Sequence, residues 1–179
     1  GFGSLSLGQL AAANDAFGIG EHDLIDEDLS VVMGSSSIVA NSGETGSTEG
    51  NKLLYITPAM GGFSAGYSVM DSGTAAQSTD QIAMGASYTM PMAGGSMMLR
   101  FNKQTTDGTA SAETEGTNYG AKVTMGAFSA IASKGESTIG AGTSQSDDRE
   151  AAGFGIKYDL GGGMTVAASL YESDNVEGV

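Results

Sequence analysis

The sequence of 179 residues predicts an all-β fold, a transmembrane antiparallel β-barrel. Between residues 52 and 171, short segments alternate apolar residues with small polar ones, which is typical of half-buried strands. Their connections are alternately tight and long, as in a row of hairpins that crosses a membrane. The chain also has 29 Gly and no Trp, with Ala and Ser where a packed core would carry larger residues. Small residues suit a strand face that lines a wide, water-filled lumen.

Nine segments carry the strand pattern. In chain order, the expected strands are residues 1–9, 52–57, 62–70, 81–90, 96–103, 118–125, 128–134, 150–160 and 164–171. Most are close in length to the roughly 9–11 residues that a tilted transmembrane strand needs. In the segment 81–90, Ile82 and Met84 share one face with Tyr88, whereas the alternate positions hold Ala, Gly, Ser and Thr. We therefore expect one apolar face and one small, polar face along the sheet.

The connections differ at the two ends of these strands. The tight ones are residues 57–62, 91–95, 126–127 and 160–163, and the long, polar ones are residues 71–80, 104–117 and 135–150. We expect the tight turns at the periplasmic end and the long loops outside. Phe63, Tyr88, Phe128 and Tyr158 lie near the tight turns, where an aromatic girdle would meet the membrane interface. A soluble β-sandwich is the alternative, but its buried faces would need larger residues than Ala and Met.

Three basic residues fall on the small, polar face of three different strands. Arg100, Lys122 and Lys157 would each cost roughly 2–4 kcal/mol if they faced lipid in mid-strand. On the opposite face they meet water, so the pattern predicts that they line the lumen. Ordinary solvated charges on the outer surface of a sheet are the alternative interpretation of each one.

Composition excludes several classes of function. The net charge of −14 argues against nucleic acid as a partner, because phosphate binding needs a basic surface. The absence of cysteine excludes disulfides and cysteine–zinc sites, and we expect no cofactor. We do not expect an enzyme, because His22 is the sole histidine and no nucleophile motif lies near it.

One interval interrupts the strand pattern, residues 10–50. A short helix is possible at residues 11–17, and an acidic run follows. That run contains Glu21, Asp23, Asp26, Glu27 and Asp28. Loops of this length without regular structure are usually functional or disordered. A solvated or calcium-binding acidic loop is possible, although the spacing of an EF-hand is not met.

Three stretches resemble general porins of the alphaproteobacterial type. They are GFGSLSLGQ at residues 1–9, NKLLYITP at 51–58 followed by GGFSAGYS at 61–68, and KYDLGGG at 157–163. Their order and spacing cover essentially the whole chain. The resemblance implies a barrel of 16 strands that forms homotrimers in the outer membrane of a Gram-negative bacterium, in contact with the lipid bilayer and lipopolysaccharide.

The resemblance also implies a function for residues 10–50, the interval that interrupts the strand pattern. In such porins the third long loop folds into the lumen and presents acidic residues to a basic wall. By position, residues 10–50 would be that pore-constricting loop, and its five carboxylates would be the acidic side of the constriction. The expected function is passive diffusion of small hydrophilic solutes and ions. The alternative is a non-conducting structural or adhesive surface protein.

The strand count predicts that residues 1–179 form part of one barrel domain. Nine is odd, whereas single-chain bacterial barrels have an even number of strands. We therefore expect four further strands before Gly1 and three after Val179. Val179 also stands where such porins end in an aromatic residue.

Overall fold

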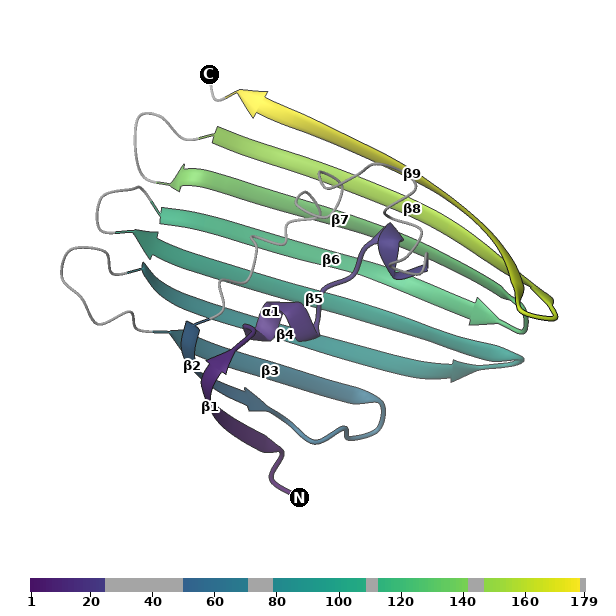
Figure 1. Ribbon diagram of the computed structural model, residues 1–179, viewed down its shortest axis with the longest axis horizontal. Helices are drawn as coiled ribbons and strands as arrows, with labels where there is room; N and C mark the ends of the chain where they lie inside the picture. Colours follow the sequence, from purple (N-terminus) through teal and green to yellow (C-terminus); the bar gives the residue numbers. More distant parts are fainter. Residues whose placement is uncertain (25–49, 71–78, 109–112, 142–146, 178–179) are drawn as a thin grey trace.

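The computed structural model describes residues 1–24, 50–70, 79–108, 113–141 and 147–177. These residues form one nine-stranded antiparallel sheet in which every strand pairs with its neighbours along the chain (Figure 1). The strands are β1 (Ser4–Leu10), β2 (Gly50–Ile56), β3 (Phe63–Met70), β4 (Thr79–Met92), β5 (Gly95–Gly108), β6 (Glu113–Met125), β7 (Phe128–Ala141), β8 (Asp147–Gly161) and β9 (Met164–Glu177). Two short helices, α1 (Ala13–Ala16) and the 3-10 helix η1 (Glu21–Leu24), follow β1. Neither they nor any other helix in the described ranges could span a membrane.

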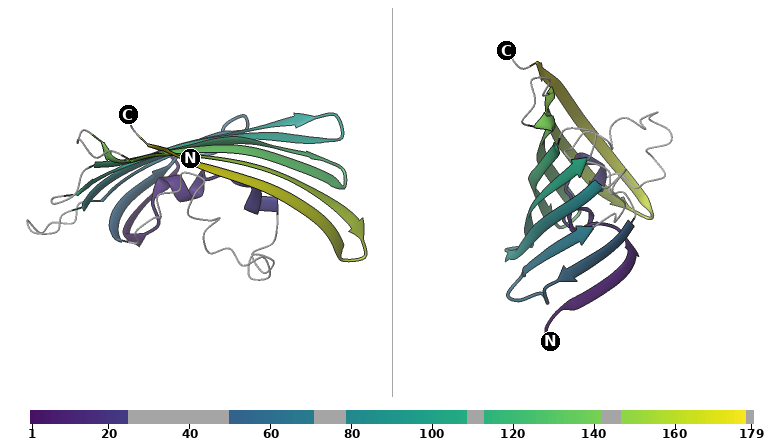
Figure 2. Two further views of the ribbon diagram at one scale, coloured as in Figure 1. Left: turned by 90° about the horizontal axis from the view of Figure 1, so that it is seen from above. Right: turned by 90° about the vertical axis from the view of Figure 1, so that its left-hand side faces the viewer.

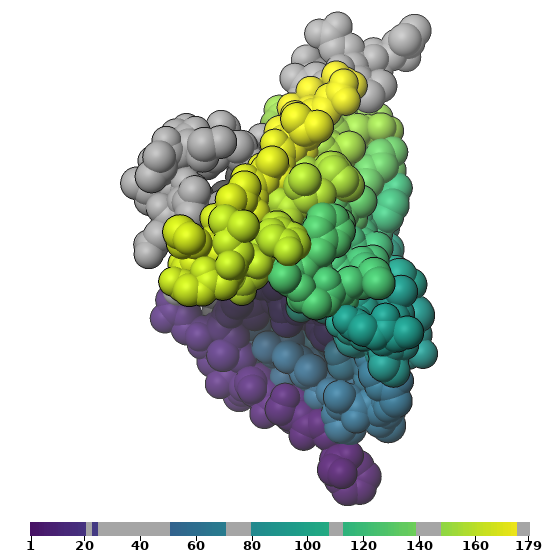
Figure 3. Space-filling model, turned by 90° about the vertical axis from the view of Figure 1, so that its right-hand side faces the viewer, coloured from purple at the N-terminus to yellow at the C-terminus, as the bar shows by residue number. Residues whose placement is uncertain are grey.

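The sheet is bent into a trough. Figure 2 shows the strands curving around one side, with α1 and η1 lying on the concave face. Figure 3 views the end with the tight turns, where the wall runs continuously from the N-terminal strands to the C-terminal ones. The all-β, antiparallel prediction and the nine expected strands are confirmed, and α1 lies within the short helix expected at residues 11–17.

The convex face is apolar, as the alternation predicts. Its exposed large side chains include Tyr55, Phe63, Tyr67, Ile82, Met84, Tyr88, Leu99, Phe101, Tyr119, Phe154, Ile156 and Leu170. The register lines them up across strands, since Leu99 lies opposite Tyr88 and Ala121. The concave face instead holds buried polar residues such as Ser68, Asn102 and Asn118. One face is therefore suited to lipid and the other to water.

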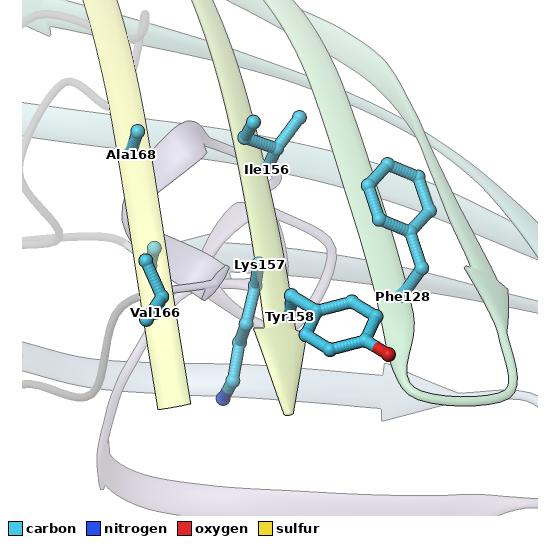
Figure 4. A pocket seen from close by; sticks show the side chains of 7 residues that line it. Phe128, Ile156, Lys157, Tyr158, Val166 and Ala168 are labelled. Atoms are coloured by element: carbon cyan, nitrogen blue, oxygen red, sulfur yellow. The ribbon is translucent and has the colours of Figure 1, made fainter. Parts of the chain in front are cut away.

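Aromatic side chains lie near the tight turns on the convex face. Phe128 and Tyr158 are paired across β7 and β8, and together with Ile156, Val166 and Ala168 they line a shallow apolar hollow (Figure 4). Gly94 and Gly126 close two of these turns with φ values of +83° and +56°, which residues with a side chain rarely adopt. The tight connections therefore lie where the sequence predicts them.

Two of the expected long loops are shorter than predicted. Residues 104–117 and 135–150 were expected to be loops, but β5 runs on to Gly108, β6 begins at Glu113, β7 runs on to Ala141 and β8 begins at Asp147. These stretches are polar on both faces, so hydrophobic alternation does not mark them. Their many Thr residues still favour extended backbone, and the ladder continues, as between Thr105 and Glu115.

The strands therefore extend beyond the apolar belt at the end opposite the tight turns. There the convex face carries ion pairs. Lys103 Nζ lies 3.1 Å from Glu115 Oε1, and Lys134 Nζ lies 3.0 Å from Glu136 and 3.1 Å from Glu150. These pairs are partly exposed, so each contributes little to stability. These charged pairs mark the level at which the apolar, lipid-compatible surface of the convex face ends.

The two faces can be tested at adjacent positions in β5. Leu99 is in the middle of the apolar belt, whereas Met98 faces the concave side opposite Lys122. We expect Leu99→Glu to lower the free energy of unfolding by roughly 1–3 kcal/mol, because it places a carboxylate against lipid. Met98→Glu should cost less, because it meets water and an opposite charge. Denaturant unfolding in phospholipid vesicles measures both, and equal losses would contradict the assignment of faces.

Candidate functional site

The candidate site is the segment that crosses the concave face, residues 11–24, here called the wall segment. Its helix α1 packs against β2, β3, β4 and β5, and its helix η1 packs against β7, β8 and β9. Residues 11–24 therefore cross most of the inner wall directly after β1 (Figure 1). Because the sheet is curved around it, its position affects the space enclosed by the trough.

The first contact fixes the start of α1. Ala12, the N-cap residue, has no side chain that could accept a hydrogen bond from the helix. Ser68 of β3 supplies the acceptor instead, since Ala13 N donates to its Oγ at 2.9 Å. Ala12 and Ala13 are fully buried against Ala83 of β4. The wall thus satisfies a backbone donor that the helix leaves free.

The second contact is a notch that receives Phe17. Its ring and Cβ lie directly over Gly66 of β3 and Gly85 of β4, two residues that face each other in the register. A Cβ atom at Gly85 would lie 2.5 Å from Phe17 Cβ, and one at Gly66 would lie 2.6 Å from Phe17 Cε2. Both distances are shorter than real Cβ contacts, so a side chain at either position would displace Phe17. Phe17 is 3% exposed.

The third contact holds the backbone of Phe17, Gly18 and Ile19. Three consecutive carbonyl oxygens accept hydrogen bonds from the wall: Phe17 O from Asn102 Nδ2 at 3.2 Å, Gly18 O from Arg100 Nη1 at 2.7 Å and Ile19 O from Asn118 Nδ2 at 3.0 Å. Asn118 Oδ1 also accepts from Ile19 N at 3.0 Å and from Asn102 Nδ2 at 3.1 Å. Asn102 and Asn118 lie directly opposite each other in β5 and β6.

The end of the wall segment is held by an apolar cluster and by a lysine. Ile19, Leu24 and Ile131 of β7 form a buried cluster. In η1, Asp23 Oδ2 accepts a hydrogen bond from Gly20 N at 3.0 Å, and Lys122 Nζ donates to the backbone carbonyl of Asp23 at 3.3 Å. This carboxylate therefore stabilises the turn that carries it.

The basic residues predicted for the lumen all lie in concave-face positions. Arg100 and Lys122 contact the wall segment, but through backbone carbonyls rather than carboxylates. Lys157 alternates with Ile156 and Tyr158 in β8 and pairs with Ser129 and Ala167, close to the tight turns. Of the three predicted basic residues, Arg100 in β5 and Lys122 in β6 therefore bond to the wall segment.

The acidic residues predicted for the constriction are only partly described. Asp23 is exposed, and Glu21 is the first residue of η1. Asp26, Glu27 and Asp28 lie outside the described residues. The prediction that these five form one acidic wall therefore remains a prediction.

Sequence reasoning did not find the residues that hold the wall segment. These are Phe17, Gly66, Gly85, Asn102 and Asn118. A signal was present, since both glycines and both asparagines fall on the small, polar face of adjacent strands. Their significance depends on the register and on the segment that covers them.

Comparison with known proteins gives one match. A family model described as Gram-negative porin matches residues 1–179, which is the whole sequence. No curated protein and no solved structure matches the chain.

The Phe17 notch can be tested with a double-mutant cycle. We expect Gly66→Ala to destabilise the docked wall segment by about 1–3 kcal/mol, because the new methyl group overlaps the Phe17 ring at Cε2. In a Phe17→Ala background the same substitution should cost close to nothing, because the overlapping ring is gone. Hydrogen exchange of residues 11–24 measures both effects. Additive costs would show that the two residues do not touch.

The docked position can also be tested by cross-linking, because the chain has no cysteine of its own. We expect Ile19→Cys with Ile131→Cys to form a disulfide on mild oxidation, since both residues belong to one buried cluster. The control pair, Ile19→Cys with Ala132→Cys, places the second thiol on the opposite face of β7. The fraction of cross-linked protein in each pair is measured by labelling the remaining free thiols and determining the intact mass. Equal cross-linking in both pairs would refute the docked position.

Proposed function

The chain belongs to the Gram-negative porin family, whose model matches it over residues 1–179, and we propose that it forms a water-filled channel for small hydrophilic solutes and ions. The family places the protein in the outer membrane of a Gram-negative bacterium and consists of channels rather than enzymes. Transport would be passive diffusion down a concentration gradient.

One observation carries this proposal: the wall segment lies on the concave face of a sheet whose convex face is apolar. A curved wall with an apolar outside and a polar inside separates lipid from water. A segment folded onto the inside reduces the cross-section that solutes can use. A purely adhesive surface protein would not need a segment in that place.

We assign the constriction to residues 10–50. Its acidic side would consist of Glu21, Asp23, Asp26, Glu27 and Asp28, and the opposing bases of the lumen would include Arg100, Lys122 and Lys157. Opposite charges across a narrow, low-dielectric passage create a transverse field that acts on every permeating ion. The excess of acids in the chain favours cations over anions.

The assembly we propose is a homotrimer in the lipid bilayer, with lipopolysaccharide around its outer rim. The ion pairs of Lys103 and Lys134 support the contact with lipopolysaccharide, because they place charged groups on the convex face just beyond the apolar belt. At that level the surroundings change from acyl chains to polar headgroups. No cofactor and no nucleic acid enter this function.

The deciding experiment is a single-channel recording of the purified protein in a planar lipid bilayer. We expect stepwise, ohmic conductance and a reversal potential in a salt gradient that indicates a preference for cations. Membranes that take up the protein without any conductance would overturn the proposal and favour a non-conducting structural or adhesive protein.

The charge assignment predicts a change in selectivity. We expect the triple variant Asp26→Asn, Glu27→Gln and Asp28→Asn to shift the reversal potential toward anions, because it removes three negative charges from the constriction. The matched control removes three carboxylates from the convex side, with Asp107→Asn, Asp148→Asn and Glu172→Gln. Equal shifts in the two triple variants would show that the acidic run does not face the permeating ions.

A further inference from the structure

The strongest unexplained feature is how the wall recognises Phe17, Gly18 and Ile19. Among the described residues, every side-chain hydrogen bond to these three residues comes from β5 or β6, and each one is made to their backbone. Their carbonyl oxygens accept from Asn102, Arg100 and Asn118 at 2.7–3.2 Å. Three consecutive carbonyls bonded to side chains fix the direction of the backbone as well as its distance from the wall.

The side-chain amide of Asn118 makes the same hydrogen bonds to Ile19 as the backbone of a neighbouring strand would make. Its amide accepts from Ile19 N at 3.0 Å and donates to Ile19 O at 3.0 Å, the two bonds that a residue of a paired strand would make. Asn102 supports it, because its Nδ2 donates both to Phe17 O and to Asn118 Oδ1. Asn102, Asn118 and Ile19 are all essentially buried. Loss of Asn118 would therefore leave a buried donor and a buried acceptor of Ile19 without these partners.

The apolar contacts fix the same three residues along the wall. Phe17 occupies the notch over Gly66 and Gly85, and Ile19 Cγ2 lies 3.0 Å from the place of a Cβ at Gly120. The side chains flanking Gly18 therefore enter two recesses in the wall, one on β3 and β4 and the other on β6. The hydrogen bonds to the backbone lie between these two recesses. If the wall segment moved along the wall by one residue, both the side-chain contacts and the backbone hydrogen bonds would be lost.

From these contacts we propose that Asn102, Asn118 and Arg100 are positioning residues of the channel. They fix Phe17–Ile19 on the inner wall, and this anchor sets how far the wall segment reaches into the lumen. The inference rests on the proposed channel function and deepens it. Arg100 has a role here that differs from a charge facing the solute, because its Nη1 is bonded to a carbonyl of the protein itself.

The two asparagine amides of the anchor are expected not to respond to pH or salt. They do not titrate and carry no charge. Hydrogen bonds between buried neutral groups are also screened little by ions. The acidic run, which begins at Glu21 within the wall segment, is charged, so its field would change with salt while the anchor keeps its position.

The test uses a variant that changes no charge. Asn118→Leu is close to isosteric and removes the two bonds to Ile19. The matched control is Thr124→Val, an isosteric loss of a polar group on the same face of β6, where Thr124 Oγ1 accepts from Ser129 Oγ rather than bonding to residues 11–24. Hydrogen exchange at residues 11–24 and single-channel conductance are measured for both variants in the purified protein.

We expect the Ile19 amide of Asn118→Leu to exchange about tenfold faster or more, because a buried hydrogen bond is lost. Open channels of this variant should show altered or multiple conductance levels, with an unchanged reversal potential. Thr124→Val should match the wild type in both measurements. If Asn118→Leu fails to fold, Asn102→Ala replaces it, since it leaves both Asn118–Ile19 bonds in place and should give a smaller change of the same kind.

Two results would overturn the inference while the channel function stands. One is a conducting wild type with an Ile19 amide that stays protected in Asn118→Leu. The other is faster exchange of that amide with conductance levels identical to the wild type, which would limit Asn118 to a structural role. A wild type that does not conduct at all would instead overturn the proposed function itself.

Discussion

The structure depends on one constraint, which is that a wall exposed to lipid must pair its backbone donors and acceptors within the sheet. From β1 to β9 each strand pairs with its sequence neighbours, and the register is regular apart from shifts at Glu113/Thr114 and Asp159/Gly161. Since side chains alternate along a strand, this ladder assigns each residue to the lipid side or to the lumen. The apolar convex face and the polar concave face are two consequences of the same pairing.

The concave face has a second requirement, which is to hold a segment that is not part of the ladder. Residues 11–24 cannot complete their backbone hydrogen bonds by themselves, because α1 and η1 are each a single short turn. Wall side chains supply the missing partners, through Ser68 at the start and through Asn102, Arg100 and Asn118 in the middle. Small residues serve the same purpose, since only glycine leaves room for Phe17. The small, polar composition of the lumen face is thus suited both to water and to a docked loop.

The sequence predicted the strands well where one face is apolar and less well where both faces are polar. Alternation located the segment 81–90 because Ile82 and Met84 differ sharply from Ala83 and Gly85. It could not locate the polar ends of β5 to β8, where continued pairing rather than a lipid face maintains the extended backbone. For the candidate site, charge alone identified Arg100 and Lys122 as lumen residues. It did not reveal that both bond to backbone carbonyls, nor that the uncharged Asn102 and Asn118 make more hydrogen bonds to the wall segment than the two charged residues do.

The sequence by itself determined the all-β class, the nine strands of the described residues, the side of each strand that meets lipid and the interruption of the strand pattern after residue 9. Those features follow from period-two alternation and from turn residues, which are local in the chain. Only the tertiary structure decided where residues 11–24 lie on the wall. Ile19 and Asn118 are 99 residues apart, and Phe17 reaches glycines in two different strands. Such contacts arise from register and curvature, which no local pattern encodes.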